Sequence, residues 1–367
     1  MIPVNLPKIG EEEIEAVAKV MRSGMLTSGL GAGPKVLEFE KNYAEFAGVK
    51  HAIAVNTGTA ALHSALMAAG IKSGDEVILP SFTFVATAEA VVLAGGKPVF
   101  ADIDSLTFTL SAESIKKAIT AKTKAIVPVD LYGLPVDMKP IREIADEQKM
   151  VIVQDCAQSH GATYEGKPTG TLADLACWSL YAAKNIGTGE GGVVTTDNDQ
   201  LAEKVRMVRT HGEKVKYQSL MLGTNYRMTE IQAAIGVVQL KKLPDFLAKR
   251  TRNAQRLTKN LENIEKIKLP PELKNRKPSW YLYTIRIKDI SENERNAIIR
   301  EMHDKGIGAE AYYPIPVHQM PYYREKFGAF NLLETDNAAK QVLSLPIHPS
   351  VTDEQIDFIA QTLLSLL

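Results

Sequence analysis

Lys184 is the residue of this chain with the most distinctive chemical surroundings. Apolar residues precede it, and a run of glycines follows it (Gly187, Gly189, Gly191 and Gly192). A lysine in isolation is most often a solvated surface residue. The glycines argue against that reading here, because a backbone without Cβ atoms can turn sharply and approach another group closely. An amine held at such a turn is suited to nucleophilic chemistry on a carbonyl carbon.

A carboxylate, Asp155, stands at the end of the apolar run 151–154, about one strand's distance upstream of that turn. Taken alone, an acid at this place is equally well explained as a helix cap. Beside a reactive lysine it has a second use, since a carboxylate can keep a pyridinium nitrogen protonated. A lysine, a strand-end acid and a glycine-rich turn are the parts that hold pyridoxal phosphate (PLP). Gln158 could donate to the phenolic oxygen of its ring, and Ser179 could add a hydroxyl to its phosphate.

A third segment, 51–62, predicts a strand, a tight turn at Thr57-Gly-Thr and the start of a helix. The free N–H groups at a helix N-terminus attract phosphate. Taken alone, the turn is better explained by ordinary capping by Thr57 or Thr59, so the phosphate interpretation depends on the other segments. Phe82 and Phe84 follow the next predicted strand. Such aromatics usually belong to the core, although one of them could lie flat on a cofactor ring.

The overall composition is that of an ordinary globular protein without a strong net electrostatic field. The chain has 367 residues, 45% of them hydrophobic, and Lys plus Arg (43) equals Asp plus Glu (43). This balance gives no general attraction to nucleic acid or to an anionic membrane. We expect a cytoplasmic protein, because neither a signal peptide nor an apolar run of about 18 residues is visible. His160, His211 and His318 lack metal-ligand spacing, so no metal site is predicted, and Cys156 and Cys177 are expected to be buried thiols.

Strand-like runs alternate with helical runs up to about residue 210, which predicts an α/β fold with a mostly parallel sheet flanked by helices. Ligand sites in such sheets lie at the carboxyl ends of strands. Further on, we predict a helix over 228–240, an interruption at Pro244 and a second helix from 247 to about 261. The expected division is a large PLP-binding domain with an N-terminal arm, 1–244, and a smaller C-terminal α+β domain, 245–367.

In this order, the segments of the chain resemble the sugar aminotransferases of the DegT/DnrJ/EryC1/StrS family, which are PLP enzymes of the aspartate-aminotransferase fold (fold type I). The resemblance covers essentially the whole chain. It is carried by Ile9-Gly-Glu-Glu-Glu, Ser23-Gly-Met-Leu-Thr-Ser-Gly, Asn56-Thr-Gly-Thr-Ala-Ala-Leu, Pro80-Ser-Phe-Thr-Phe-Val-Ala-Thr, Asp155-Cys-Ala-Gln-Ser-His-Gly-Ala, Lys184 with its Gly-Glu-Gly-Gly, Asn225-Tyr-Arg-Met and Tyr313-Pro-Ile-Pro-Val-His-Gln.

The resemblance implies a role for each matching residue. Lys184 would form the Schiff base, and Asp155 would pair with the pyridine nitrogen. The other implied cofactor contacts are Gln158 to the phenolic oxygen, Phe84 stacked on the ring, and Gly58, Thr59 and Ser179 around the phosphate. Asn225 would reach the phosphate from the neighbouring subunit of a homodimer with shared active sites. The loop from Tyr312 to His318, with Tyr313 and His318 as candidate contacts, would lie near a sugar.

The implied reaction transfers an amino group from an L-amino acid, with L-glutamate as the expected donor, to a nucleotide-linked keto-sugar in amino or deoxysugar biosynthesis. The alternative is a same-fold aminotransferase that acts on a ketocyclitol or another small ketone, and a non-catalytic PLP-binding regulator is a further one. Gln154 and Asp130 depart from the family's usual residues, and we expect neither to touch the chemistry directly. A branch with histidine in place of the lysine performs dehydration, so Lys184 favours the transaminases.

Overall fold

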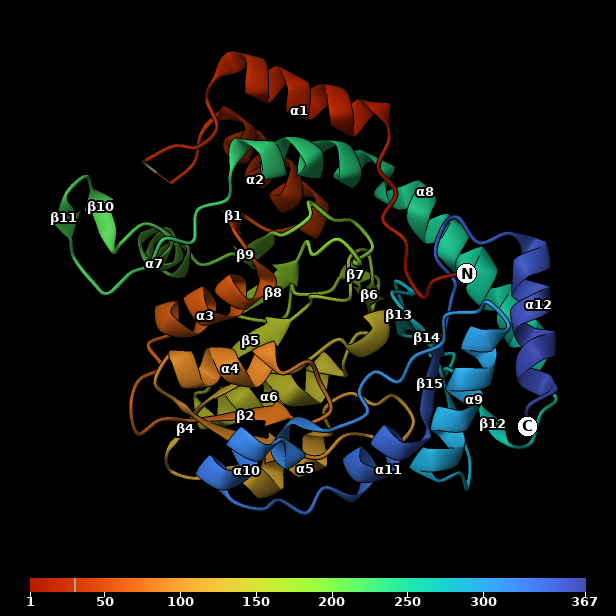
Figure 1. Ribbon diagram of the computed structural model, residues 1–367. Coiled ribbons are helices and arrows are strands. Elements are labelled where there is room, and N and C mark those ends of the chain that lie inside the picture. Colours follow the sequence, from red (N-terminus) through yellow and green to blue (C-terminus); the bar gives the residue numbers. More distant parts are fainter. Residues whose placement is uncertain (30) are drawn as a thin grey trace.

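The computed structural model describes residues 1–29 and 31–367. A seven-stranded sheet with the order β1-β9-β8-β5-β4-β2-β3 forms its centre (Figure 1). Its strands are β1 (His51–Val55), β2 (Glu76–Pro80), β3 (Lys97–Ala101), β4 (Thr123–Ile126), β5 (Val151–Asp155), β8 (Leu175–Ser179) and β9 (Gly192–Thr196). The pairs from β8 across to β3 are parallel, and β9 is antiparallel to both of its neighbours. The predicted α/β fold with a mostly parallel sheet is confirmed.

Helices cover both faces of this sheet. One face packs against α3 (Gly58–Ala68), α4 (Ala86–Leu93) and α7 (Asp199–Arg209). On the opposite face, α2 (Pro34–Ala47) and α8 (Glu230–Leu261) cover the end that contains β1, and α5 (Ala112–Ala118) and α6 (Met138–Gln148) cover the other end. Successive side chains of a strand point to opposite faces, so strands covered on both sides must be apolar throughout. The sheet residues accordingly are buried along most of their length.

α8 is a single helix that runs through Pro244. The prediction of two helices separated at this proline is therefore wrong. A proline removes one backbone hydrogen bond and bends a helix, but burial on both sides can keep the helix continuous across the bend. Leu243 and Phe246 flank the proline and are both buried in the core. Figure 1 shows the helix changing direction part-way along its length. The expected domain boundary at 244/245 falls inside this helix, and the division into domains stays a prediction.

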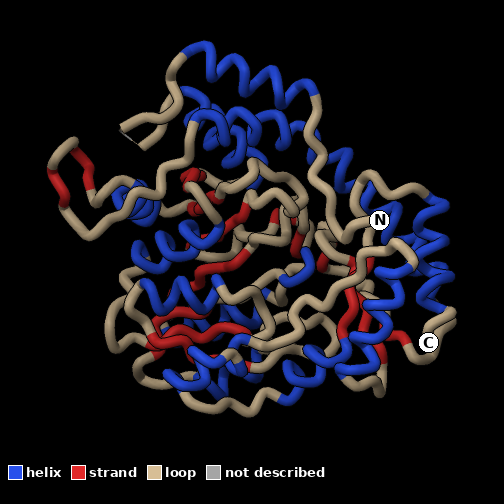
Figure 2. Tube along the Cα trace, viewed as in Figure 1, coloured by secondary structure: helices blue, strands red, loops and turns tan. Residues whose placement is uncertain are grey.

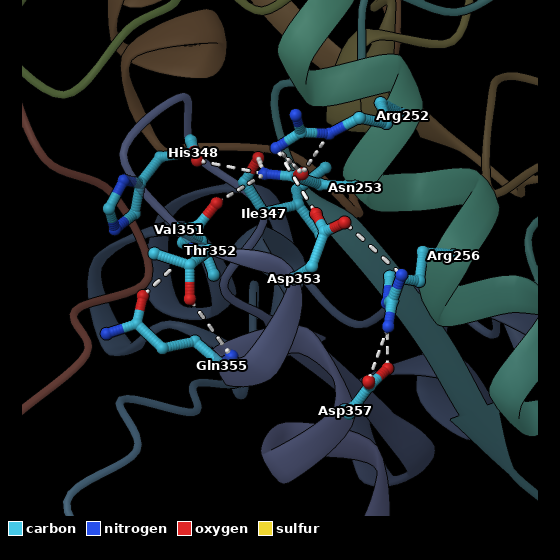
Figure 3. Close-up of polar contacts among 10 residues, drawn as sticks. All are labelled: Arg252, Asn253, Arg256, Ile347, His348, Val351, Thr352, Asp353, Gln355 and Asp357. Carbon is cyan, nitrogen blue, oxygen red and sulfur yellow. Dashed lines mark hydrogen bonds and ion pairs between the residues drawn. The ribbon is translucent and has the colours of Figure 1, made fainter.

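The C-terminal part has a hydrophobic core of its own, formed between the second half of α8, a small sheet and two helices. Its elements are β12 (Ile267–Lys268), β14 (Tyr283–Ile287), β15 (Val342–Leu345), α9 (Glu292–Asp304) and α12 (Asp353–Leu364). Figure 3 shows how α8 holds the start of α12. Arg256 Nε donates to Asp357 at 2.8 Å, and the Asn253 amide donates to the carbonyl of His348 at 3.2 Å.

Two segments connect the C-terminal part with the part of the chain that forms the central sheet. The N-terminal residues return to the C-terminal part, where the Ile2 N–H donates to the Gly306 carbonyl at 2.7 Å. In the other direction, Tyr323 packs on Phe100 of β3 with ring centroids 5.9 Å apart. The remaining helices and short strands lie outside the central sheet and the sheet of β12, β14 and β15 (Figure 2). They are α1 (Glu11–Ser23), α10 (Pro321–Phe327), α11 (Leu333–Gln341), β6 (Thr163–Tyr164), β7 (Lys167–Pro168), β10 (Glu213–Val215), β11 (Gln218–Ser219) and β13 (Arg276–Lys277).

Candidate active site

A cavity of about 710 Å³ lies at the carboxyl ends of the central strands. Its floor comes from the ends of β5 and β8 and from the start of α3, and its walls come from the loops after β2 and β8 and from the C-terminal part. The cavity brings together most of the residues predicted to form the site. They are Gly58, Thr59, Phe84, Asp155, Gln158, Ser179, Lys184 and Tyr313. Segments that are far apart in the sequence therefore meet where parallel strands end.

Asp155 is a buried carboxylate at the end of β5, only 5% exposed. Its Oδ2 accepts from Thr87 Oγ1 at 2.9 Å, and its Oδ1 accepts from the Ala157 N–H at 3.1 Å. Burial raises the pKa of Asp155, while these donors and nearby Lys184 act in the opposite direction. The helix-cap explanation of Asp155 is wrong, because a turn and then β6 follow β5, and Oδ1 stabilises this turn. The two neutral donors do not fully offset the loss of water around the buried carboxyl. A cation beside this carboxyl would stabilise its ionised form.

Lys184 follows β8 in a loop that folds back on itself. The Ala182 N–H donates to the Gly189 carbonyl at 2.9 Å, and the Lys184 N–H donates to the Tyr181 carbonyl at the same distance. The amine Nζ lies 4.5 Å from the centre of the Tyr281 ring. Burial lowers the pKa of Lys184 to about 8, with Asp155 and Tyr181 acting against this shift. Deprotonation to the neutral form, which a nucleophile or general base requires, is therefore much easier near physiological pH than for an ordinary lysine.

The start of α3 forms a cradle with Ser179. A Cβ atom added to Gly58 would lie 2.7 Å from the Ser179 Cβ, so only glycine fits this approach. Thr57 caps the helix by accepting from the Ala60 N–H at 3.0 Å, which confirms the ordinary reading of this residue. Gly58 and Thr59, the first residues of α3, line the cavity, and a helix N-terminus provides the partial positive charge that a phosphate needs.

Two aromatic rings form one wall of the cavity. Phe84 is 55% exposed, so it is not a core residue, and its ring centroid lies 6.1 Å from that of Tyr313. The Tyr313 hydroxyl is 3.2 Å from Gln158 Nε2, which donates to it. The other end of the Gln158 amide accepts from the Tyr132 N–H at 2.6 Å. One hydrogen of Nε2 is left for a ligand, since an amide nitrogen carries two.

Asn225 and His318 are the predicted site residues that the described structure does not bring into the cavity. Asn225 is exposed and lies where the chain leaves the hairpin of β10 and β11. His318 is only 4% exposed, and its Nδ1 lies 2.7 Å from the hydroxyl of Ser81, behind the cavity wall. Burial in this position leaves its ring no surface that could contact a ligand in the cavity.

Several residues line the cavity without having been expected from the sequence. Met1 and the segment 3–5 come from the N-terminal arm, and Tyr281, His303 and Glu310 come from the C-terminal part. No local pattern could have indicated them, because each reaches the cavity only through long-range packing. Thr87 could have been indicated by the sequence, because it belongs to a segment already assigned to the site and lies one helical turn after Phe84.

Asp130 and Gln154, the two departures from the family's usual residues, form a buried network behind Asp155. The Gln154 amide donates to Asp130 at 2.9 Å, and the Ser159 hydroxyl donates to it at 2.8 Å. The Asp130 N–H in turn donates to the Asp155 carbonyl at 3.0 Å. Burial raises the pKa of Asp130. Neither residue lines the cavity, and their hydrogen bonds hold the end of β5 in place.

Other sequence expectations concern cysteines, metals and membranes. Cys156 and Cys177 are both buried free thiols, as expected. Across residues 1–29 and 31–367, no group of three or more His, Cys, Asp or Glu side chains is placed to hold a metal ion. Within the same residues, no helix is long and apolar enough to cross a bilayer.

The cavity fits PLP in three respects. A buried lysine with a lowered pKa can bond to its aldehyde carbon, and a buried carboxyl with a raised pKa can pair with its pyridinium nitrogen. A helix N-terminus packed against a serine can receive its phosphate. Fold and site together define a PLP-dependent transferase of fold type I.

Comparison with known proteins identifies the family. The model of the DegT/DnrJ/EryC1/StrS aminotransferase family matches residues 7–364, and the chain belongs to this family. It is 38% identical to GDP-perosamine synthase of Caulobacter vibrioides over 97% of this chain and 95% of that protein. It is 37% identical to the spore coat polysaccharide biosynthesis protein SpsC of Bacillus subtilis over 97% and 94% of the two chains. Spr1654 of Streptococcus pneumoniae, solved in its PLP form, superposes with a TM-score of 0.94 at 29% identity over 100% and 98% of the two chains. The protein is a PLP-dependent aminotransferase.

Proposed function

We propose that this aminotransferase transfers the amino group of L-glutamate to a nucleotide-linked keto-sugar, in the biosynthesis of an amino sugar for a cell-surface polysaccharide or glycoconjugate. The observation that carries the proposal is the placement of Lys184, with a pKa of about 8, in one cavity with buried Asp155. The cavity volume of about 710 Å³ leaves room for a substrate beyond the cofactor. The names of the two relatives, a GDP-perosamine synthase and a spore coat polysaccharide protein, support a sugar acceptor.

Bound PLP supplies an electron sink for the carbanion that forms at the substrate carbon. Asp155 would hold the proton on the pyridine nitrogen, because a cation at this point offsets the cost of burying the carboxylate. Lys184 Nζ would accept the proton from the α-carbon of the donor and return it to the cofactor's aldehyde carbon. Its lowered pKa makes the neutral, basic form available at neutral pH.

The remaining residues would bind and orient. The N–H groups of Gly58 and Thr59 and the hydroxyl of Ser179 would hold the phosphate. Phe84 would lie against the cofactor ring, and Gln158 would donate its free amide hydrogen to the phenolic oxygen. Tyr313 would stand beside the sugar. Each of these residues already faces the cavity.

We infer a homodimer in which Asn225 completes the phosphate site of the partner subunit. Asn225 is exposed, and next to it lie exposed apolar residues of the hairpin region, with Tyr217 83% and Leu222 77% exposed. Apolar surface of this kind favours contact with another chain. The test mixes two inactive variants, Lys184→Ala and Asn225→Ala, under conditions that exchange subunits. A shared site predicts recovered activity, because each mixed dimer contains one site without either substitution. Mixtures that exchange subunits and stay inactive would contradict the shared site.

Spectroscopy and an acceptor panel test the function itself. L-glutamate should convert the yellow protein to its pyridoxamine form, with one equivalent of 2-oxoglutarate released per site. The pyridoxamine form is then offered 3-keto and 4-keto sugars carried on GDP, dTDP and UDP, with ketocyclitols as the competing class. Return of the yellow form with a sugar nucleotide supports the proposal. Return with ketocyclitols alone would favour the alternative acceptor, and no change with any amino donor would favour a regulator. A cytoplasmic location is part of the proposal, since sugar nucleotides are made there.

A further inference from the structure

His318 is held by three hydrogen-bonding contacts behind the cavity wall. Its backbone N–H donates to Ser81 Oγ at 2.9 Å, and its ring Nδ1 lies 2.7 Å from the same oxygen. Ser81 Oγ already accepts from the backbone, so its own hydrogen can go to Nδ1. The ring proton then sits on Nε2, which lies 3.3 Å from the Asp336 carboxylate. Ser81 has no exposed surface, so the two contacts to its hydroxyl are shielded from water, whereas Asp336 is partly exposed.

The same serine also holds the residue before the histidine. The Val317 N–H donates to the Ser81 carbonyl at 3.0 Å. We call this arrangement of Ser81, Val317 and His318 the Ser81 clamp. It joins the end of β2, one residue after Pro80, to the end of the segment that carries the cavity tyrosines.

The clamp fixes one end of the segment 310–317. The other end is paired with β15, where the Glu310 N–H donates to the Ser344 carbonyl at 3.2 Å and the Ser344 N–H donates back at 2.8 Å. Tyr312 and Tyr313 lie between these two anchors and line the cavity. Side-chain contacts from Tyr132 and Gln158 also reach this segment. The positions of the two tyrosines thus depend on both anchors.

Phe84, on the same wall, has an anchor of its own. Its carbonyl accepts from the Thr87 N–H at 3.2 Å at the start of α4. Loosening the Ser81 clamp should therefore move the tyrosine segment more than the ring of Phe84. The cofactor contacts would change little, and the outer part of the cavity would change more.

We propose that His318 is a positioning residue for the acceptor, which acts through Ser81 to set where Tyr312 and Tyr313 stand in the cavity. The inference rests on the proposed function, because it takes the acceptor to be the large substrate that fills the cavity beyond the cofactor. The amino donor is small and reacts close to Lys184, so it depends less on the tyrosine segment. His318 itself does not touch either substrate.

Two substitutions of His318 separate its contacts. His318→Asn places an amide near the position of Nδ1, so it keeps the Ser81 contact and loses Asp336. His318→Gln reaches toward the position of Nε2, so it keeps Asp336 and loses Ser81. The acceptor KM should rise on the order of tenfold in His318→Gln, as expected for one buried hydrogen bond, and less than about threefold in His318→Asn. In His318→Gln the acceptor half-reaction should slow more than the donor half-reaction.

Two further variants test the route through Ser81. Ser81→Ala should raise the acceptor KM at least as much as His318→Gln, because it removes the contact to Nδ1 and also the one to the His318 backbone N–H. The double variant should be no worse than Ser81→Ala alone, because the contact that His318→Gln removes is already lost. Asp336→Asn is the matched control and should leave the acceptor KM within about twofold. Melting temperatures and PLP affinity are measured for every variant, because a merely structural role predicts parallel losses in both half-reactions that follow stability.

Hydrogen exchange gives a readout that needs no acceptor. In the PLP-loaded protein, the amides of residues 311–313 and 315 should exchange faster in His318→Gln than in His318→Asn, by on the order of tenfold. Equal exchange in the two variants, or an Asn variant that loses more acceptor affinity than the Gln variant, would overturn the positioning role. If no sugar nucleotide reacts with the wild-type protein, the proposed function fails, and the exchange result still decides the role of the clamp.

Discussion

Asp155→Asn separates a catalytic role of this carboxyl from a purely structural role in the turn after β5. The amide has the same shape and keeps an oxygen that can accept from the Ala157 N–H, which is 3.1 Å from Oδ1. It removes the charge that would hold the pyridinium proton. Breaking a buried ion pair costs about 3–5 kcal/mol, which corresponds to a loss of roughly 10²- to 10⁴-fold in rate.

The same substitution should leave the apo protein as stable as the wild type. Burial raises the pKa of Asp155 above its unfolded value. A carboxyl of this kind binds its proton more readily in the folded state, so its ionisation destabilises the fold as the pH rises through the unfolded and then the folded pKa. At pH 7 an uncharged amide avoids this cost. We therefore expect an apo melting temperature at or slightly above that of the wild type.

The assay measures two quantities on the same preparations. Stopped-flow absorbance after addition of L-glutamate gives the rate of the donor half-reaction, and thermal unfolding of the apo protein gives its stability. Thr87→Val is a milder variant for comparison. It removes the Thr87 hydroxyl, which donates to Asp155 Oδ2 at 2.9 Å, and it keeps the charge of Asp155. Its rate loss should be smaller, on the order of tenfold. An Asp155→Asn protein that melts several degrees lower and still reacts within tenfold of the wild type would refute the reasoning.

Two other predictions address the cradle and the lysine. Gly58→Ala should weaken PLP binding by at least tenfold, measured by equilibrium dialysis, because its Cβ would lie 2.7 Å from the Ser179 Cβ. Gly70→Ala has open space around its Cβ but a left-handed φ of +85°, so it should lower stability and leave PLP affinity unchanged. Equal affinities in both variants would count against the cradle. The folded pKa of Lys184, about 8, lies below the value of 10.5 that an exposed lysine has. The unfolded state therefore binds more protons between these values, and the destabilising effect of the lysine is lost as the pH rises from about 8 to 10.5. The stability advantage of apo Lys184→Met over the wild type should shrink across this range in chemical denaturation, and an advantage that does not vary with pH would contradict the lowered pKa.

The sheet and most of the site were predictable from the sequence, for a physical reason. Strands buried on both faces are apolar along their whole length, so a polar residue at the end of such a run, such as Asp155, is conspicuous. Parallel strands then bring these ends to one edge. Lys184 was conspicuous because the glycines after it allow a close approach, and the structure places it in the same cavity as Asp155.

Other features depend on packing that no local pattern encodes. Pro244 indicated a helix end, but the buried residues on each side of it keep α8 continuous. His318 stands in a segment that does border the cavity, yet its ring turns to Ser81, 237 residues away in the sequence. The N-terminal arm reaches the cavity because Ile2 pairs beside Gly306. Contacts between residues so far apart in the sequence depend on the whole fold, and no local sequence pattern predicts them.

The most direct test of the account is chemical labelling of Lys184. The holoenzyme is reduced with borohydride, digested and mapped by mass spectrometry, with Lys184→Ala treated in parallel. We expect the pyridoxyl label on the peptide that contains Lys184, and no stable label on the variant. A label on another lysine of the wild-type protein, or a wild-type protein that retains no label, would contradict the central claim.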